Sequence, residues 1–214
     1  MALALLGDSA TVTSINPPEG SAQASHCSRF YPMARDALFE MSSWGFSTVR
    51  ANLSQVTNNF TMWTYAYQVP SNMVNSLAVL DSAAGDDYAV PYLQSYTPFG
   101  VQLSGRSVYE PQPYAVEFDP DLGVEVILTN QENACLRYTQ VVTDTTLFSP
   151  TFVTTLAYFL ASFLAGPIIK GDAGMTVSSA MMKKTMEMLA VSRPSDANQG
   201  MTRVSQSVPW MVSR

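Results

Sequence analysis

The sequence predicts an α+β fold that is mainly α, a helical bundle with an inserted small antiparallel β domain. Hydrophobic residues make up 47% of the 214 residues, enough to form a core. In three stretches the apolar residues recur three or four positions apart, which is the spacing of one helix face. Short alternating segments, separated by turn residues, lie between the first and second of these stretches and are typical of antiparallel strands.

These patterns divide the chain into three parts. Residues 1–80 and 144–195 are expected to form the helical core, and residues 81–143 a β-rich insertion. Residues 196–214 are expected to form an extended C-terminal tail, because they are polar and lack a clear period. The length of the chain suits one helical domain that carries such an insertion.

The first expected helix begins between Ser21 and Ser25 and ends at Gly45. Its apolar face consists of Ala24, Cys27, Tyr31, Ala34, Leu38 and Met41. Pro32 lies inside this stretch and has no backbone N–H, so we expect it to kink the helix or to mark a later start. The next residues, to about Leu80, are expected to be extended and to end in a strand over Asn75–Leu80.

The inserted part is expected to hold a three-stranded meander. Residues 81–113 are rich in Gly, Ser, Pro and Asp, which predicts an irregular loop or a small β excursion. The expected strands are Tyr114–Phe118, Val124–Thr129 and Cys135–Val142. Between the first two, Asp119–Gly123 has the chemistry of a tight turn, with proline second and glycine last. So small a sheet is stable only when one face packs on an apolar surface.

Two helices are expected to close the chain. The first begins at Ser149-Pro150, with serine as its cap, and ends at Gly166-Pro167. It is apolar nearly all round, and its run is shorter than the roughly 20 residues of a membrane span, so we expect a core helix. The second begins after Gly171 and ends at Pro194, and its methionines fill the core or form an adaptable contact surface.

The expected core and contact residues follow from these patterns. The core candidates are Trp44, Phe46, Tyr65, Tyr67, Phe152, Leu156, Phe159, Leu160 and Phe163. The candidates for partner contacts are Val208, Trp210, Met211, Asp119 and Asp121. An isolated tryptophan in a polar tail is either an anchor for a partner pocket or part of a disordered end. The acidic turn either faces a partner or is simply solvated.

Charge is scarce and mostly negative. Charged residues make up 13% of the chain, about half the usual fraction, and the net charge is −6. So little charge indicates a surface covered by partner chains or one rich in uncharged polar groups. No basic stripe of the kind that tracks nucleic acid is present, so sequence-specific DNA binding is not expected. The apolar start Met1–Leu6 is too short and lacks the basic residues of a signal peptide.

No catalytic or metal-binding pattern stands out. The chain has one histidine, His26, and no zinc-ligand spacing, nucleophile elbow or phosphate-binding loop, so no cofactor and no metal are expected. Cys27 and Cys135 lie in apolar surroundings and are expected to be buried free thiols. Glu117 and Glu125 fall on neighbouring strands, so a glycosidase pair is an alternative to solvated carboxylates.

Several short strings together resemble one protein family. They are Trp44-Gly-Phe46-Ser-Thr48, Tyr65-Ala-Tyr67-Gln-Val-Pro70, and Phe148-Ser-Pro150-Thr-Phe152 leading into a Leu/Ala helix that ends in Leu164-Ala-Gly-Pro167-Ile168. In this order and spacing they resemble the tail tubular protein A family, the head-to-tail adaptors of short-tailed bacteriophages (podoviruses). The resemblance covers roughly residues 22–193. Residues 81–113 and the Trp210 tail depart from the family pattern.

The resemblance implies a structural role rather than an enzymatic one. Family members form a ring, a dodecamer, which connects the portal protein to the tail nozzle (tail tubular protein B) and lines the DNA exit channel. The helices would face the portal and the β part the nozzle, with tail fibres attached near the nozzle junction. The expected location is the virion tail, after synthesis in the host cytoplasm and without insertion into a membrane. The alternative is a phage tail component with carbohydrate hydrolase activity.

Overall fold

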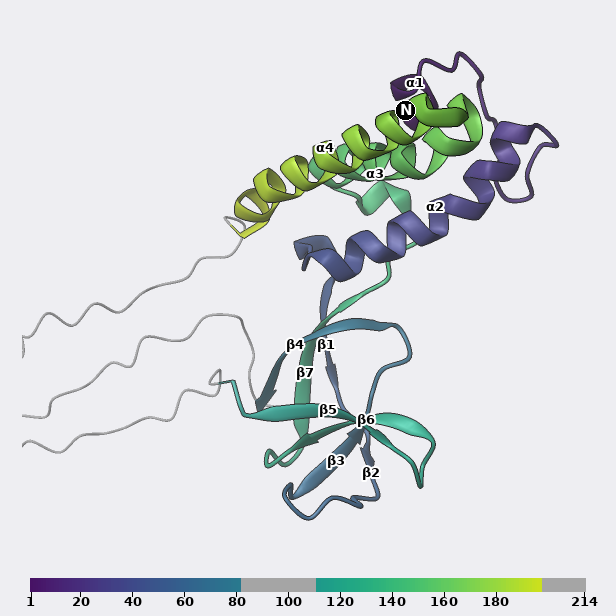
Figure 1. Ribbon diagram of the computed structural model, residues 1–214. Helices are drawn as coiled ribbons and strands as arrows, with labels where there is room; N and C mark the ends of the chain where they lie inside the picture. The colour runs from purple at the N-terminus through teal and green to yellow at the C-terminus, as the bar shows by residue number, and fades with distance from the viewer. Residues whose placement is uncertain (82–110, 198–214) are drawn as a thin grey trace, which may run out of the picture. The chain divides into compact units, whose positions relative to one another are not determined.

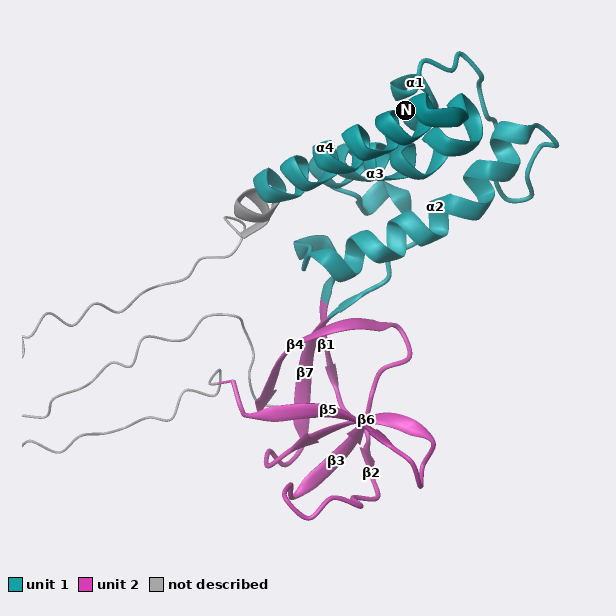
Figure 2. Ribbon diagram, in the orientation of Figure 1, with its two compact units in different colours: residues 1–48, 139–199 teal, residues 49–138, 200–214 magenta. Residues whose placement is uncertain are grey.

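The computed structural model describes residues 1–81 and 111–197, with side chains to Ser192, and forms two compact units. The helical unit comprises Met1–Thr48 and the chain from Thr139 to the end of the last helix. The β unit comprises Val49–Tyr138, without the undescribed loop (Figures 1 and 2). Each unit contains its own buried side chains and is considered separately below.

The expectation of a mainly helical bundle is wrong. The described residues form four helices and two antiparallel sheets with seven strands, so the chain is α+β with a substantial β part. Residues 49–80, which the sequence patterns placed with the helices, belong to the β unit. They form four of the strands: the strand expected over Asn75–Leu80 is part of β4, whereas β1, β2 and β3 were not predicted as separate strands, because short, half-buried strands leave only a weak alternating pattern.

The helical unit contains α1 (Ala2–Leu5), α2 (Ala22–Met41), α3 (Pro150–Ile169) and α4 (Gly171–Ala197). The expected serine cap of α3 is present, because the N–H of Phe152 donates to Ser149 Oγ at 3.3 Å. Helix α2 also has a serine cap, in which the N–H of Ala24 donates to Ser21 Oγ at 3.1 Å. Helix α2 runs on through the exposed Pro32 and ends at Met41, so the proline does not delay its start.

Two helix ends differ from the expectation. Helix α3 continues through Pro167 to Ile169, and the chain reverses at Lys170, whose φ is +62°. Pro167 lies in the last turn, where its missing donor costs a single hydrogen bond, and the N–H of Lys170 still reaches the carbonyl of Gly166 at 3.0 Å. Helix α4 likewise passes position 194 and ends at Ala197.

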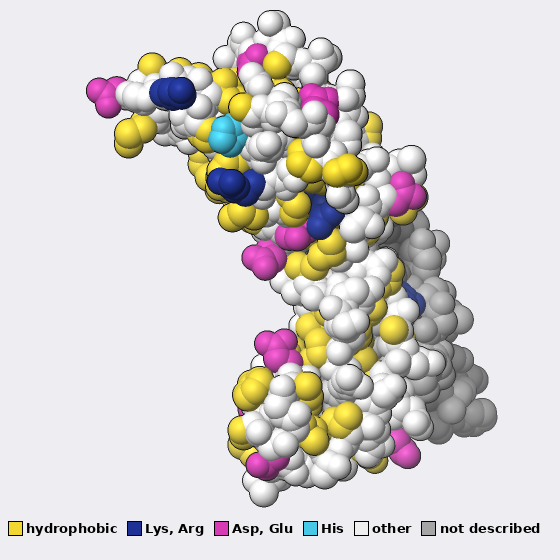
Figure 3. All heavy atoms as spheres, turned by 90° about the vertical axis from the view of Figure 1, so that its right-hand side faces the viewer, with side chains coloured by type: hydrophobic (Ala, Val, Ile, Leu, Met, Phe, Trp, Pro, Cys, Tyr) yellow, Lys and Arg dark blue, Asp and Glu magenta, His cyan; other side chains and the backbone are white. Residues whose placement is uncertain are grey.

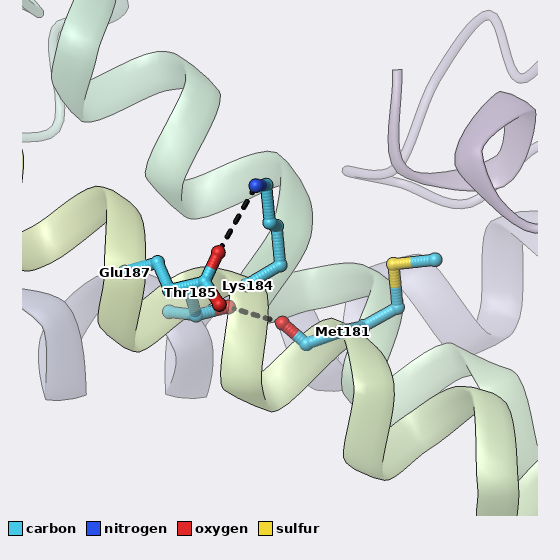
Figure 4. Close-up of polar contacts among 4 residues, drawn as sticks. All are labelled: Met181, Lys184, Thr185 and Glu187. Carbon is cyan, nitrogen blue, oxygen red and sulfur yellow. Dashed lines mark hydrogen bonds and ion pairs between the residues drawn. The ribbon is translucent and has the colours of Figure 1, made fainter.

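Helices α3 and α4 pack closely through small residues. A Cβ atom at Gly174 would lie 3.0 Å from the carbonyl oxygen of Ala165, so the glycine sets the distance between the two backbones. One turn further on, Ser178 Oγ donates to the carbonyl of Ser162 at 2.7 Å. The buried Thr185 donates to the carbonyl of Met181 at 2.9 Å, while Lys184 pairs with Glu187 at 3.0 Å on the outer side (Figure 4).

Helix α3 is the central helix of the unit. Ten of its residues are buried, among them the expected core residues Phe152, Leu156, Phe159 and Leu160, while Phe163 is half-buried. It is also the one helix in the described residues that is long and apolar enough to cross a membrane, and 56% of that apolar window is buried in the structure. Length and composition alone do not separate a core helix from a membrane span.

An aromatic cluster joins the end of α2 to the start of α3. It contains Phe39, Trp44, Phe46, Phe148 and Phe152, whose neighbouring rings have centroids 4.6 to 6.3 Å apart. The indole N–H of Trp44 donates to the carbonyl of Leu38 at 3.1 Å, so its polar atom is satisfied inside the core. Two of the strings behind the family resemblance therefore form one packed cluster.

The β unit is built from two sheets. The strands are β1 (Thr48–Asn52), β2 (Gln55–Val56), β3 (Tyr65–Gln68), β4 (Met73–Asp81), β5 (Tyr114–Asp119), β6 (Val124–Thr129) and β7 (Ala134–Gln140). One sheet has the order β1-β7-β4 and the other β2-β3-β6-β5. Tyr67, Val79, Ile127 and Leu136 come from both sheets and form one buried cluster, with Tyr65 packed at its edge.

The expected meander is wrong in its third strand. Strands β5 and β6 pair as a hairpin, with Tyr114 opposite Thr129 and Asp119 opposite Val124. Strand β7 does not continue this sheet but lies between β1 and β4 in the other one. Both faces of β6 are therefore covered: Ile127 packs in the cluster between the sheets, and Val126 and Leu128 pack in a second cluster.

Candidate functional site

The tip of the β5–β6 hairpin, residues 116–125, is the most unusual surface among the described residues. Every residue in this run except Asp119 is exposed. Four of them are large and apolar, Val116, Phe118, Leu122 and Val124, and the phenylalanine is 61% exposed. In Figure 3 apolar side chains lie beside acidic ones on the β-rich part of the chain. Val116 and Phe118 lie two residues apart on one face of β5, whereas Val124 is opposite Asp119 and points to the other face. Exposed apolar side chains grouped in this way mark a candidate interaction site.

Acidic groups surround these apolar side chains. Glu117, Asp121 and Glu125 are exposed within the same run, and it contains no basic residue. The described part of the β unit as a whole has six acids, Asp81, Glu117, Asp119, Asp121, Glu125 and Glu132, against Arg50 and Arg137. The hairpin tip therefore favours a partner that is apolar and basic.

Asp119 has a different role from the one expected. Its carboxylate is completely buried and accepts the backbone N–H groups of Asp121 and Leu122, at 2.9 and 3.2 Å. The Asn59 side-chain amide donates to both carboxylate oxygens, at 3.0 and 3.3 Å. The N–H of Gly123 donates to the carbonyl of Asp119 at 2.8 Å and closes the backbone turn. The φ of Gly123 is +67°. Asp119 therefore fixes the hairpin rather than facing a partner, whereas Asp121 is exposed.

The outer face of α4 is a second apolar surface. Met175, Met186 and Val191 are exposed on it, between 46% and 73%. Its exposed charges, Asp172, Lys183, Lys184 and Glu187, balance one another. The hydrogen bond from Lys184 lowers the pKa of the Glu187 carboxyl, so this ion pair is fully charged at neutral pH. Of the two roles considered for these methionines, the exposed ones fit a contact surface.

Among the described residues, the candidate metal ligands and the two candidate glutamates are not brought together. Within residues 1–81 and 111–192, no three His, Cys, Asp or Glu side chains lie close enough to hold a metal ion. Glu117 is opposite Val126 and Glu125 is opposite Phe118, so the two glutamates lie in adjacent pairs and point to opposite faces of the hairpin. They do not flank one common space, as a glycosidase pair must.

The two cysteines are buried free thiols, as expected. Burial raises the pKa of both thiols, so little of the reactive thiolate is present at neutral pH. Cys27 lies beside a pocket of about 460 Å³ under the N-terminal segment, with Tyr31 and Leu160. The pocket is lined mostly by apolar groups and brings together no set of polar groups that would select a ligand.

The expected contact residues of the tail, Val208, Trp210 and Met211, lie outside the described residues. Sequence reasoning noticed the acids of the hairpin but missed its apolar residues. The missed signal was the alternation of Val116 and Phe118 on a strand whose tip has no covering partner in the described chain. A search of protein-family models found no match to this sequence, and a search of curated proteins found none either.

Proposed function

We propose that this chain is a structural head-to-tail adaptor of a short-tailed bacteriophage. In this role it forms a ring, a dodecamer in the family that it resembles, between the portal protein and the tail nozzle. The resemblance of the strings at residues 44–48, 65–70 and 148–168 supports the proposal, together with their order along the chain. The location that we propose is the virion tail, at the junction of head and tail.

The observation that carries the proposal is the uncovered apolar surface. A chain with 13% charged residues exposes large apolar side chains on the hairpin tip and along α4. A soluble monomer rarely leaves several such groups together in water, because burying each one is worth roughly 1.5 to 3 kcal/mol. An obligate ring covers surfaces of this kind against neighbouring copies and flanking virion proteins.

The charge of the chain suits the wall of a DNA channel. A net charge of −6 repels the phosphate backbone, so DNA would pass without being held or read. Portal, nozzle and tail fibres would be protein partners, and the chemistry requires no cofactor. The alternative, a carbohydrate hydrolase of the tail, gains no support from the opposite orientation of Glu117 and Glu125.

Native mass spectrometry tests the proposal directly. The chain is measured alone and after mixing with portal rings encoded by the same genome. We expect a complex in which many copies of the chain bind one portal ring. A variant with Met175→Lys and Met186→Lys should bind in lower copy number, whereas Met33→Lys, at an exposed site on helix α2, should not differ from the parent. A chain that stays monomeric and ignores portal rings would contradict the proposal.

A further inference from the structure

The hairpin tip is held in one conformation by hydrogen bonds. The buried Asp119 carboxylate holds the turn through four hydrogen bonds, so the exposed apolar groups are presented in one geometry. Such preorganisation lowers the entropy that binding costs. Strand β5 is also the outer strand of its sheet in the described chain. Just before it, Gln112 bridges to Val79 of β4, and beyond this bridge the edge of β5 can pair with an added strand.

Two parts of the chain are poor occupants of this surface. The loop 82–110 contains Asp86, Asp87 and Glu110 against Arg106, so its charge repels the acidic hairpin. The outer face of α4 has balanced charges and offers the hairpin no net attraction.

The C-terminal segment 198–214 complements the hairpin in charge and has an apolar stretch near its end. Its charged side chains are Arg203 and Arg214, and it contains no acid. Its apolar residues gather at Val208-Pro-Trp210-Met-Val212, in which Val208, Trp210 and Val212 are two positions apart. Pro209, at an odd position, is compatible with an edge strand because an edge needs donors on one side only.

We propose that segment 198–214 of one copy docks along the outer edge of β5 in a neighbouring copy. Trp210 and Val208 pack on Phe118 and Val116, and the arginines lie toward the hairpin acids. The seventeen residues reach up to about 55 Å when extended, which is enough to cross to another subunit. Because this contact joins two different surfaces, it can repeat from one copy to the next. It closes into a ring when the rotation between neighbouring copies divides a full turn. This inference rests on the proposed ring.

Cross-linking between marked copies tests the contact. Leu122→Cys in ¹⁵N-labelled chain is mixed with Ser207→Cys in unlabelled chain, free and on portal rings, and treated with a short bismaleimide. The native thiols are buried and give little background. We expect a cross-linked pair that contains one copy of each variant. Ser71→Cys, at an exposed site elsewhere in the β unit, is the matched control for Leu122→Cys and should give no such pair.

A charge swap tests the specificity. Glu117→Lys with Glu125→Lys, and separately Arg203→Glu with Arg214→Glu, should each lower the yield of cross-linked pairs about tenfold. Mixing the two reversed chains should restore most of that yield. Independent, additive losses would overturn the proposal, and so would the absence of mixed cross-linked pairs from rings that have formed on the portal.

The two proposals fail in different ways. If rings form on the portal but the hairpin and tail variants assemble like the parent, the docking model is wrong and the adaptor function stands. If no ring forms under any condition, the adaptor function is wrong, whatever the cross-linking shows. Circular dichroism of every variant separates loss of contact from loss of fold.

Discussion

At the scale of single residues, Asp119 is buried in the β unit and fixes the turn of the exposed hairpin tip. A carboxylate without water is costly unless donors satisfy it, and here two backbone N–H groups and the amide of Asn59 do so. The sequence pattern predicted the turn, because proline and glycine occupy characteristic positions. It did not predict the burial of Asp119, which depends on Asn59, sixty residues away in the chain.

Asp119→Ala should destabilise the protein by about 1 to 3 kcal/mol, because it leaves buried donors without an acceptor. The matched variant Asp121→Ala removes an exposed carboxylate two residues away and should change stability by less than about 0.5 kcal/mol. Urea unfolding followed by circular dichroism measures both. Equal effects of the two variants would show that the buried hydrogen bonds contribute nothing.

At the scale of elements, the caps were predictable and the strand order was not. Ser21 and Ser149 signal their helices locally, through a side chain that accepts a nearby N–H. The place of β7 between β1 and β4 depends on pairing partners far away in sequence, which no local pattern encodes. For the same reason, the exposure of Phe118 depends on which other segments cover strand β5, so the sequence of this strand alone could not predict it.

The contact of α3 with α4 gives a prediction for these elements. Gly174→Val should cost about 1 to 3 kcal/mol, because its side chain meets the Ala165 carbonyl on a neighbouring backbone. Ala173→Val, one position earlier and exposed, puts the same side chain into solvent and should cost under about 1 kcal/mol. Thermal unfolding compares the two variants. If Gly174→Val lowered the thermal stability less than Ala173→Val does, helices α3 and α4 would be able to move apart without a loss of stability.

At the scale of the whole molecule, the described part of the β unit is one insertion in the helical unit. The chain enters it through β1 and leaves it through β7, and these strands are neighbours in one sheet. The two ends of the insertion therefore lie side by side, the arrangement in which inserted domains fold by themselves.

The fragment 48–140 should accordingly fold alone and unfold cooperatively. The reason is that its main buried cluster draws only on its own strands. Circular dichroism and a single thermal transition would check this. A fragment without a cooperative transition would show that the helices are needed to complete its core.

Each unit also holds one shielded thiol, Cys27 among the helices and Cys135 in β7. The rate at which each thiol is alkylated therefore reports on the unit that contains it. Alkylation of the first records opening of the helices, and alkylation of the second records opening of the sheets. Mass mapping of the modified peptides would reveal which unit opens first when the protein is heated.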